Sequence, residues 1–145
     1  MWRRLTMGMA LAATMLLAVP ALAGGRPLTA DLAAENEVGQ PGGPGDPGTT
    51  GSAFITLNQG QEEVCFDIEV EGESAPIVAA HIHTGAAGVN GGIVVDFQWS
   101  ETAGSGCVEA DADLIKDIRQ NPDQYYVNVH NSIAPTGAAR GQLSK

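Results

Sequence analysis

Apolar and polar residues alternate along much of the chain after residue 27. The alternation is longest over 62–71, whose apolar positions are Val64, Phe66, Ile68 and Val70. Since successive side chains of a strand point to opposite faces of a sheet, this pattern predicts a half-buried β-strand. The shorter run 52–58 precedes it, with Gln59 and Gly60 as turn residues, and the two runs are predicted to form a β-hairpin.

Further segments show strand patterns of the same kind. They are 28–32, 76–83, 93–99, 124–131 and 138–143. One helix is predicted, over 111–120, where Asp111 can cap the N-terminus and Leu114, Ile115 and Ile118 share an apolar face. Six or seven short strands with a single helix predict an all-β fold, a sandwich or small barrel of antiparallel strands.

The first 23 residues follow a different pattern. Arg3 and Arg4 precede a mostly apolar stretch, 5–19, and Ala21-Leu22-Ala23 then gives small residues at both ends of a cleavage motif. This layout is typical of a secretory signal peptide, and the apolar stretch is short for a membrane span. We expect cleavage after Ala23. Residues 24–145 would then form a single domain without a membrane anchor, in the periplasm or outside the cell.

The segment 39–51, GQPGGPGDPGTTG, has no strand or helix pattern. Proline lacks the amide donor that regular structure requires, and glycine loses much conformational entropy when it is ordered. We therefore expect a surface loop here.

Composition narrows the classes of partner. The 145-residue chain has 17 acidic and 7 basic residues, a net charge of −10, and two of the basic residues lie in the expected leader. This charge disfavours electrostatic binding to nucleic acid or to anionic lipid head groups. The expected partner is an unidentified protein or small ligand.

The two cysteines, Cys65 and Cys107, are predicted to form a disulfide. An even number of cysteines in an exported protein is typical of a structural cross-link. Cys65 lies on the polar side of its predicted strand, which is acceptable for one half of a disulfide. A thiolate nucleophile or metal ligand is the alternative, and an oxidising compartment disfavours it.

All three histidines lie in two of the predicted strands. His81 and His83 are two positions apart, so they share one face of their strand, and His130 points away from the core side of the other. If the two strands are neighbours, the three imidazoles converge. Copper and zinc are the metals best suited to such a set of ligands.

Two interpretations of these histidines stay open. In one, His81 and His83 hydrogen-bond to the backbone at a sheet edge or turn and hold the turn 84–92, and no metal is involved. In the other, they bind copper or zinc, and Tyr126 and Asn128, which lie on the face of His130, flank the site and orient the ligands. The four methionines all lie in the expected leader, which excludes a thioether-rich copper(I) site.

Three ordered blocks of sequence resemble the CHRD domain, the module named after chordin and found in many secreted bacterial proteins. They are AHIHTG with GVNGGIVV within 80–95, NPDQYYVNVH at 121–130 and PTGAARGQL at 135–143. The resemblance covers residues 28–143. Asn131 stands where a threonine is usual. Ala138 and Ala139 replace an acid and an apolar residue, which leaves Arg140 without a local carboxylate partner.

The resemblance implies mainly an architecture, an extracytoplasmic β-sandwich. The expected fold class is an antiparallel sandwich of the Greek-key type seen in immunoglobulin domains and copper–zinc superoxide dismutase. That dismutase needs more than three histidines, so its full chemistry is not expected here.

We expect a secreted, non-enzymatic binding or structural module. The alternative is a periplasmic or extracellular copper- or zinc-binding protein that uses His81, His83 and His130. An enzyme is the least favoured class, because the chain lacks a GxSxG motif and an evident pair of catalytic carboxylates.

Overall fold

The computed structural model describes residues 25–39, 45–100 and 104–145. The expected leader, 1–23, and the central part of the expected glycine- and proline-rich loop, 40–44, lie outside the described residues. The strands are β1 (Arg26–Ala33), β2 (Thr50–Asn58), β3 (Glu63–Glu71), β4 (Ile77–Thr84), β5 (Ile93–Asp96), β6 (Ser105–Glu109), β7 (Tyr125–Asn131) and β8 (Ala139–Gln142). The helix is α1 (Ala112–Gln120), and short 3-10 turns are η1 (Ala34–Asn36), η2 (Gln59–Gln61) and η3 (Pro122–Gln124).

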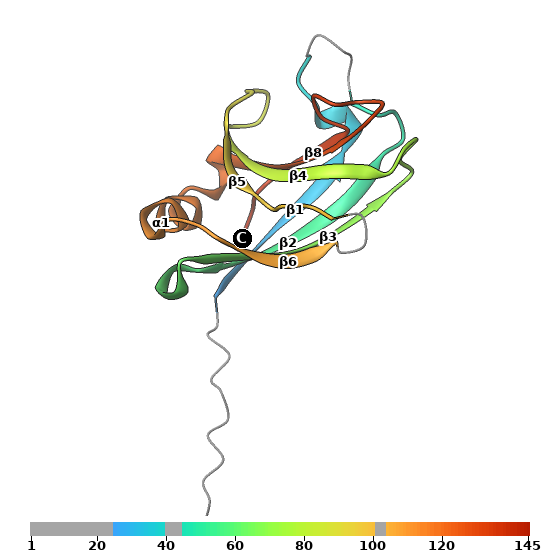
Figure 1. The fold of residues 1–145 in the computed structure, drawn as a ribbon. Helices are drawn as coiled ribbons and strands as arrows, with labels where there is room; N and C mark the ends of the chain where they lie inside the picture. Colours follow the sequence, from blue (N-terminus) through green and yellow to red (C-terminus); the bar gives the residue numbers. More distant parts are fainter. Residues whose placement is uncertain (1–24, 40–44, 101–103) are drawn as a thin grey trace, which may run out of the picture.

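The strands form one antiparallel sheet in the order β5-β4-β7-β8-β1-β2-β3-β6, which curls into a nearly closed barrel (Figure 1). The expected all-β class with one short helix is therefore confirmed, but the arrangement is barrel-like rather than a sandwich. The reason lies at β1, which pairs with β2 on one side and with β8 on the other. A Cβ on Gly141 would lie 2.3 Å from the carbonyl oxygen of Asp31, so this glycine permits the close approach of β8 to β1.

Helix α1 forms where the sequence predicts it. The Asp111 side chain caps α1 by accepting hydrogen bonds from the amides of Asp113 and Leu114. Ile115 and Ile118 are fully buried. They anchor the helix against the barrel, where α1 contacts η2, β2 and β3.

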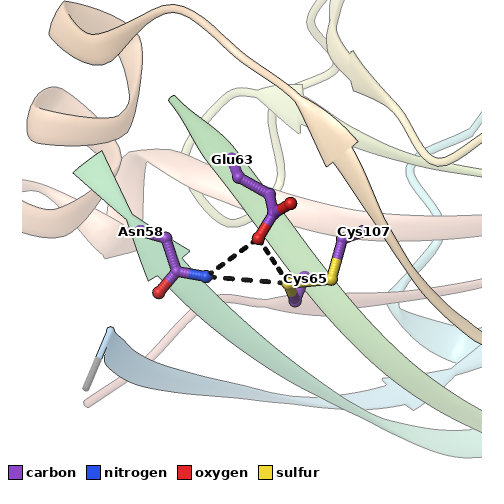
Figure 2. The surroundings of a disulfide bond; sticks show 4 residues. All are labelled: Asn58, Glu63, Cys65 and Cys107. Carbon is purple, nitrogen blue, oxygen red and sulfur yellow. Dashed lines mark hydrogen bonds between the residues drawn. A yellow bond between two sulfur atoms is a disulfide. The ribbon is translucent and has the colours of Figure 1, made fainter. Parts of the chain in front are cut away.

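Among the strands of the described residues, only β6 was missed by the hydrophobic pattern. Its five residues are mostly exposed, so it lacks the apolar alternation that marks the other strands. It pairs with β3, and Cys65 and Cys107 face each other across that pair and form the expected disulfide. Figure 2 shows Asn58 beside the disulfide, where its Nδ2 donates to Oε1 of Glu63 at 3.3 Å and to Sγ of Cys65 at 3.6 Å.

Strand β7 is buried along its whole length, on both faces. One face carries Val127 and Val129 into the apolar core. The other face carries Tyr126, Asn128 and His130, which are also buried although they point away from that core. The barrel therefore has a second, polar buried layer outside β4, β7 and β8.

Candidate metal centre

The three histidines meet in this polar layer. Strand β4 pairs with β7 in a register that places His81 opposite Asn128 and His83 opposite Tyr126, while His130 lies opposite Ala79. Each histidine offers a potential ligand atom, and the three atoms lie within 4.8 Å of one another. The expected convergence of His81, His83 and His130 is thus present in the structure, whereas metal binding itself stays a prediction.

Backbone carbonyls fix the orientation of two of the rings. Nδ1 of His83 lies 3.0 Å from the carbonyl oxygen of Gly91, and Nδ1 of His130 lies 3.2 Å from that of Pro135. A carbonyl oxygen only accepts, so both Nδ1 atoms carry the proton and both Nε2 atoms carry a lone pair. This hydrogen-bonding pattern is typical of metal-binding histidines.

The free Nε2 of His83 is buried and has no hydrogen-bond partner within the described part of the chain. Leaving a buried polar atom unpaired costs about 1–3 kcal/mol. The contact of His83 Nδ1 with Gly91 also supports the turn after β4, as the turn-bracing interpretation requires. The other nitrogen of the ring, Nε2, stays available for a metal ion.

The third ring, His81, links the site to the edge of the sheet. Its Nδ1 lies 3.1 Å from Nε2 of His130, and its Nε2 lies 3.8 Å from a carboxylate oxygen of Asp96 on β5. Two nitrogen ligands of a tetrahedral zinc ion are separated by about 3.3 Å, given metal–nitrogen distances of about 2.0–2.1 Å. The spacing of the two rings therefore already suits a shared ion.

Burial lowers the pKa of all three histidines. The pKa of His130 falls to about 4, first because of burial and then because of the neighbouring His81. Burial also lowers the pKa of His81, against the opposing effect of Asp96, and the pKa of His83. The rings are therefore neutral near pH 7, which is the form of imidazole that binds metals.

An aromatic and cationic stack supports the site from one side. The Tyr126 ring lies parallel to His83, with centroids 5.0 Å apart, and the Arg140 guanidinium lies 3.4 Å from the Tyr126 centroid. The Tyr126 hydroxyl accepts from the amide of Gly91. Tyr126 therefore contacts the candidate ligand His83 directly, as expected for a residue that flanks the site.

Arg140 is only 2 % exposed, and its hydrogen-bond partners do not include the local acid that the family pattern supplies. Its guanidinium donates to Oδ1 of Asn90 and to the carbonyl oxygen of Ala86 in the turn after β4. The nearby carboxylate of Glu37 lowers the cost of burying its charge. The acid comes from a distant part of the chain rather than from the neighbouring positions.

The sequence did not predict a role for Glu37. This residue follows η1 and is 9 % exposed, in contact with the side chain of Asn128. Burial raises its pKa to about 7, against the opposing effects of Arg140 and of the hydrogen bond to Asn128. No alternation surrounds Glu37, and its position just before the glycine-rich segment gives no sign that the side chain points inward.

The comparison with protein families agrees with the three sequence blocks that resemble the CHRD domain. The model of the CHRD domain matches residues 28–143. No curated protein and no solved structure matches the chain.

Proposed function

Since the chain belongs to the CHRD domain family, we propose that it is an extracytoplasmic, non-enzymatic binding module whose ligand is one copper or zinc ion, held by His81, His83 and His130. The observation that carries this proposal is the meeting of three neutral imidazoles in one buried layer, with ligand atoms within 4.8 Å of one another. Two of these rings have their Nε2 lone pairs fixed by hydrogen bonds at Nδ1.

A bound ion would resolve two energetic costs of this arrangement. It would supply the partner that the buried Nε2 of His83 lacks among the described residues. It would also offset the free-energy cost of burying three polar rings on adjacent strands. The apolar core on the other side of the sheet does not require that these rings be buried. A purely structural cluster would need only the contacts to Gly91 and Pro135.

The donor set supports copper(II) or zinc over softer or harder ions. Imidazole nitrogen is a good ligand for both. Both cysteines are engaged in the disulfide, and every methionine lies within residues 1–15. Thiolate and thioether ligands are therefore not part of the proposed site.

The extracytoplasmic location rests on two supports. The sequence of residues 1–23 has the pattern of a signal peptide. The disulfide between Cys65 and Cys107 suits an oxidising compartment. Within the described ranges, no helix is both long and apolar enough to cross a membrane.

Metal content tests the proposal. The exported protein is purified from cells supplied with copper and zinc, and bound metal is measured by mass spectrometry for the wild type, His81→Ala, His83→Ala and His130→Ala. One ion per chain in the wild type, lost in each variant, supports the site. A control with Glu69→Gln and Glu71→Gln, both exposed on β3, keeps its metal. Wild-type protein without metal, or histidine variants that retain it, would refute the proposal.

A further inference from the structure

Buried acceptors without donors gather beside the three histidines. In the described part of the chain, five buried side-chain atoms lack a hydrogen-bond partner, and three of them are Nε2 of His83, Oδ1 of Asn128 and Oε1 of Glu37. The proposed metal accounts for the first. Oδ1 of Asn128 is an acceptor, and so is Oε1 of Glu37 when its carboxyl is ionised, so a donor from outside the protein satisfies both atoms in that state.

Asn128 lies against the proposed metal ligands. The β4–β7 register places it opposite His81, and it precedes His130 by two positions on the same face of β7. The side chain is 3 % exposed. Its amide oxygen therefore lies in the same closed layer as the imidazoles.

Glu37 lies beside Asn128 and is held there tightly. The Arg140 charge and the Asn128 side chain both act on the carboxyl and oppose the rise of its pKa. A Cβ on Gly137 would lie 2.5 Å from Oε2 of Glu37, so the backbone of this loop packs directly on the carboxylate. The same loop supplies the Pro135 carbonyl that orients His130.

A single water molecule on the metal has the donors that these atoms lack. Three protein ligands leave a fourth position on a tetrahedral ion, which water occupies in sites of this kind. Such a water binds the ion through a lone pair and still carries two protons. The number of protons equals the number of unpaired acceptors.

Resting on the proposed function, we propose that the ion keeps an exchangeable fourth position that takes a proton-bearing oxygen ligand, water in the resting state. Asn128 and Glu37 are its positioning residues, because Oδ1 of Asn128 and Oε1 of Glu37 accept its two hydrogen bonds. The centre is therefore an open one, able to exchange its water for a small anion.

Copper(II) and azide test this inference. The copper(II)-loaded protein is prepared, and water-proton relaxation is measured during titration with azide, which displaces bound water but donates no hydrogen bond. In the wild type, we expect relaxation above that of a copper(II) protein without bound water and a loss of this excess on saturation with azide. If the water-proton relaxation equals that of a copper(II) protein without bound water and does not change with azide, the inference is overturned.

Variants test the role of the two residues. Removing one hydrogen bond to the bound water favours its displacement, so azide affinity rises about tenfold in Glu37→Leu and in Asn128→Leu, equivalent to about 1.4 kcal/mol. Glu35→Gln, an exposed acid of η1, leaves azide affinity unchanged. If one of the two variants does not fold, the other decides, and unchanged affinity there overturns the assignment. Failure to bind copper at all overturns the proposed function as well, whereas bound copper without exchangeable water overturns only this inference.

Discussion

Nδ1 of His81 lies 3.1 Å from Nε2 of His130, although the two residues are 49 positions apart in the sequence. His130 donates its own proton to Pro135, so in the metal-free protein the proton between the rings belongs to His81. An ion bound between them takes the place of that proton. His81 then carries its proton on Nε2, which faces Asp96.

In the proposed site, this change of tautomer would give Asp96 a role in metal binding. Carboxylates that accept from the second nitrogen of a metal-binding histidine raise metal affinity, and their loss costs about 10–100-fold. Because Asp96 is 65 % exposed, we expect the lower end, about a tenfold weaker affinity for copper(II) or zinc in Asp96→Asn. Isothermal titration checks this value, with Asp67→Asn on β3 as the control. Equal affinity in Asp96→Asn and the wild type would show that the carboxylate plays no part.

The disulfide between β3 and β6 is expected to contribute strongly to stability. It closes a loop of 42 positions, and in the chain-entropy model such a cross-link stabilises the fold by about 3–4 kcal/mol. The Cys65→Ala/Cys107→Ala variant should lose this amount in denaturant unfolding. Unreduced, unfolded wild type should contain no reactive thiol. Two reactive thiols, or a stability difference near zero, would contradict the assignment.

Replacing Arg140 with lysine, which keeps the positive charge, is expected to destabilise the protein. Its planar guanidinium stacks on Tyr126 while donating to Asn90 and Ala86, and a lysine ammonium cannot do both. Arg140→Lys should therefore destabilise the protein by about 2 kcal/mol, seen as a lower unfolding midpoint in urea. Arg26→Lys, at an exposed position of β1, should change stability by less than about 0.5 kcal/mol. A similarly small change in Arg140→Lys would mean that the stack contributes little.

Glu37 should make stability depend on pH in a defined window. Its folded pKa of about 7 exceeds the ordinary value of 4.5, mainly because of burial, with Arg140 and Asn128 opposing. Between these values the folded protein keeps a proton that the unfolded chain releases, so wild-type stability falls as pH rises through this window. The stability of Glu37→Gln does not fall in this window, because the glutamine side chain does not titrate. Relative to wild type, it should gain about 3 kcal/mol between pH 4.5 and pH 8 in urea unfolding. A difference that stays constant with pH would contradict the raised pKa.

The sequence was sufficient for most of the fold because each strand except one carries its own alternation. The run 62–71 became β3 almost residue for residue, and Asp111 caps α1 as expected. Strand β6 was not predicted because it has no apolar face and is defined by its pairing with β3. Closure of the barrel depends on the approach of β1 to β8 at Gly141, a long-range contact that no local pattern encodes.

The candidate site was predictable only in part. Alternation placed His81 and His83 on one face, and the β4–β7 pairing then brought His130 to them. The burial of Tyr126 and Asn128 depends on loops that cover the polar face, and alternation describes which face a side chain takes, not what lies over it. Glu37 and Arg140 are far apart in the sequence, and the charge of Arg140 acts on Glu37 because the pairing of β1 with β8 brings the two segments together.

The coordination of copper(II) tests the central claim most directly. One equivalent of copper(II) is added to the metal-free protein, and pulsed electron paramagnetic resonance counts the coordinating imidazoles in the wild type and in His83→Ala, which removes the ring whose Nε2 is unpaired. Our account predicts one copper ion with three imidazoles in the wild type and two in His83→Ala, with weaker binding. Oxygen-only ligation in the wild type, or identical spectra for the two proteins, would contradict it.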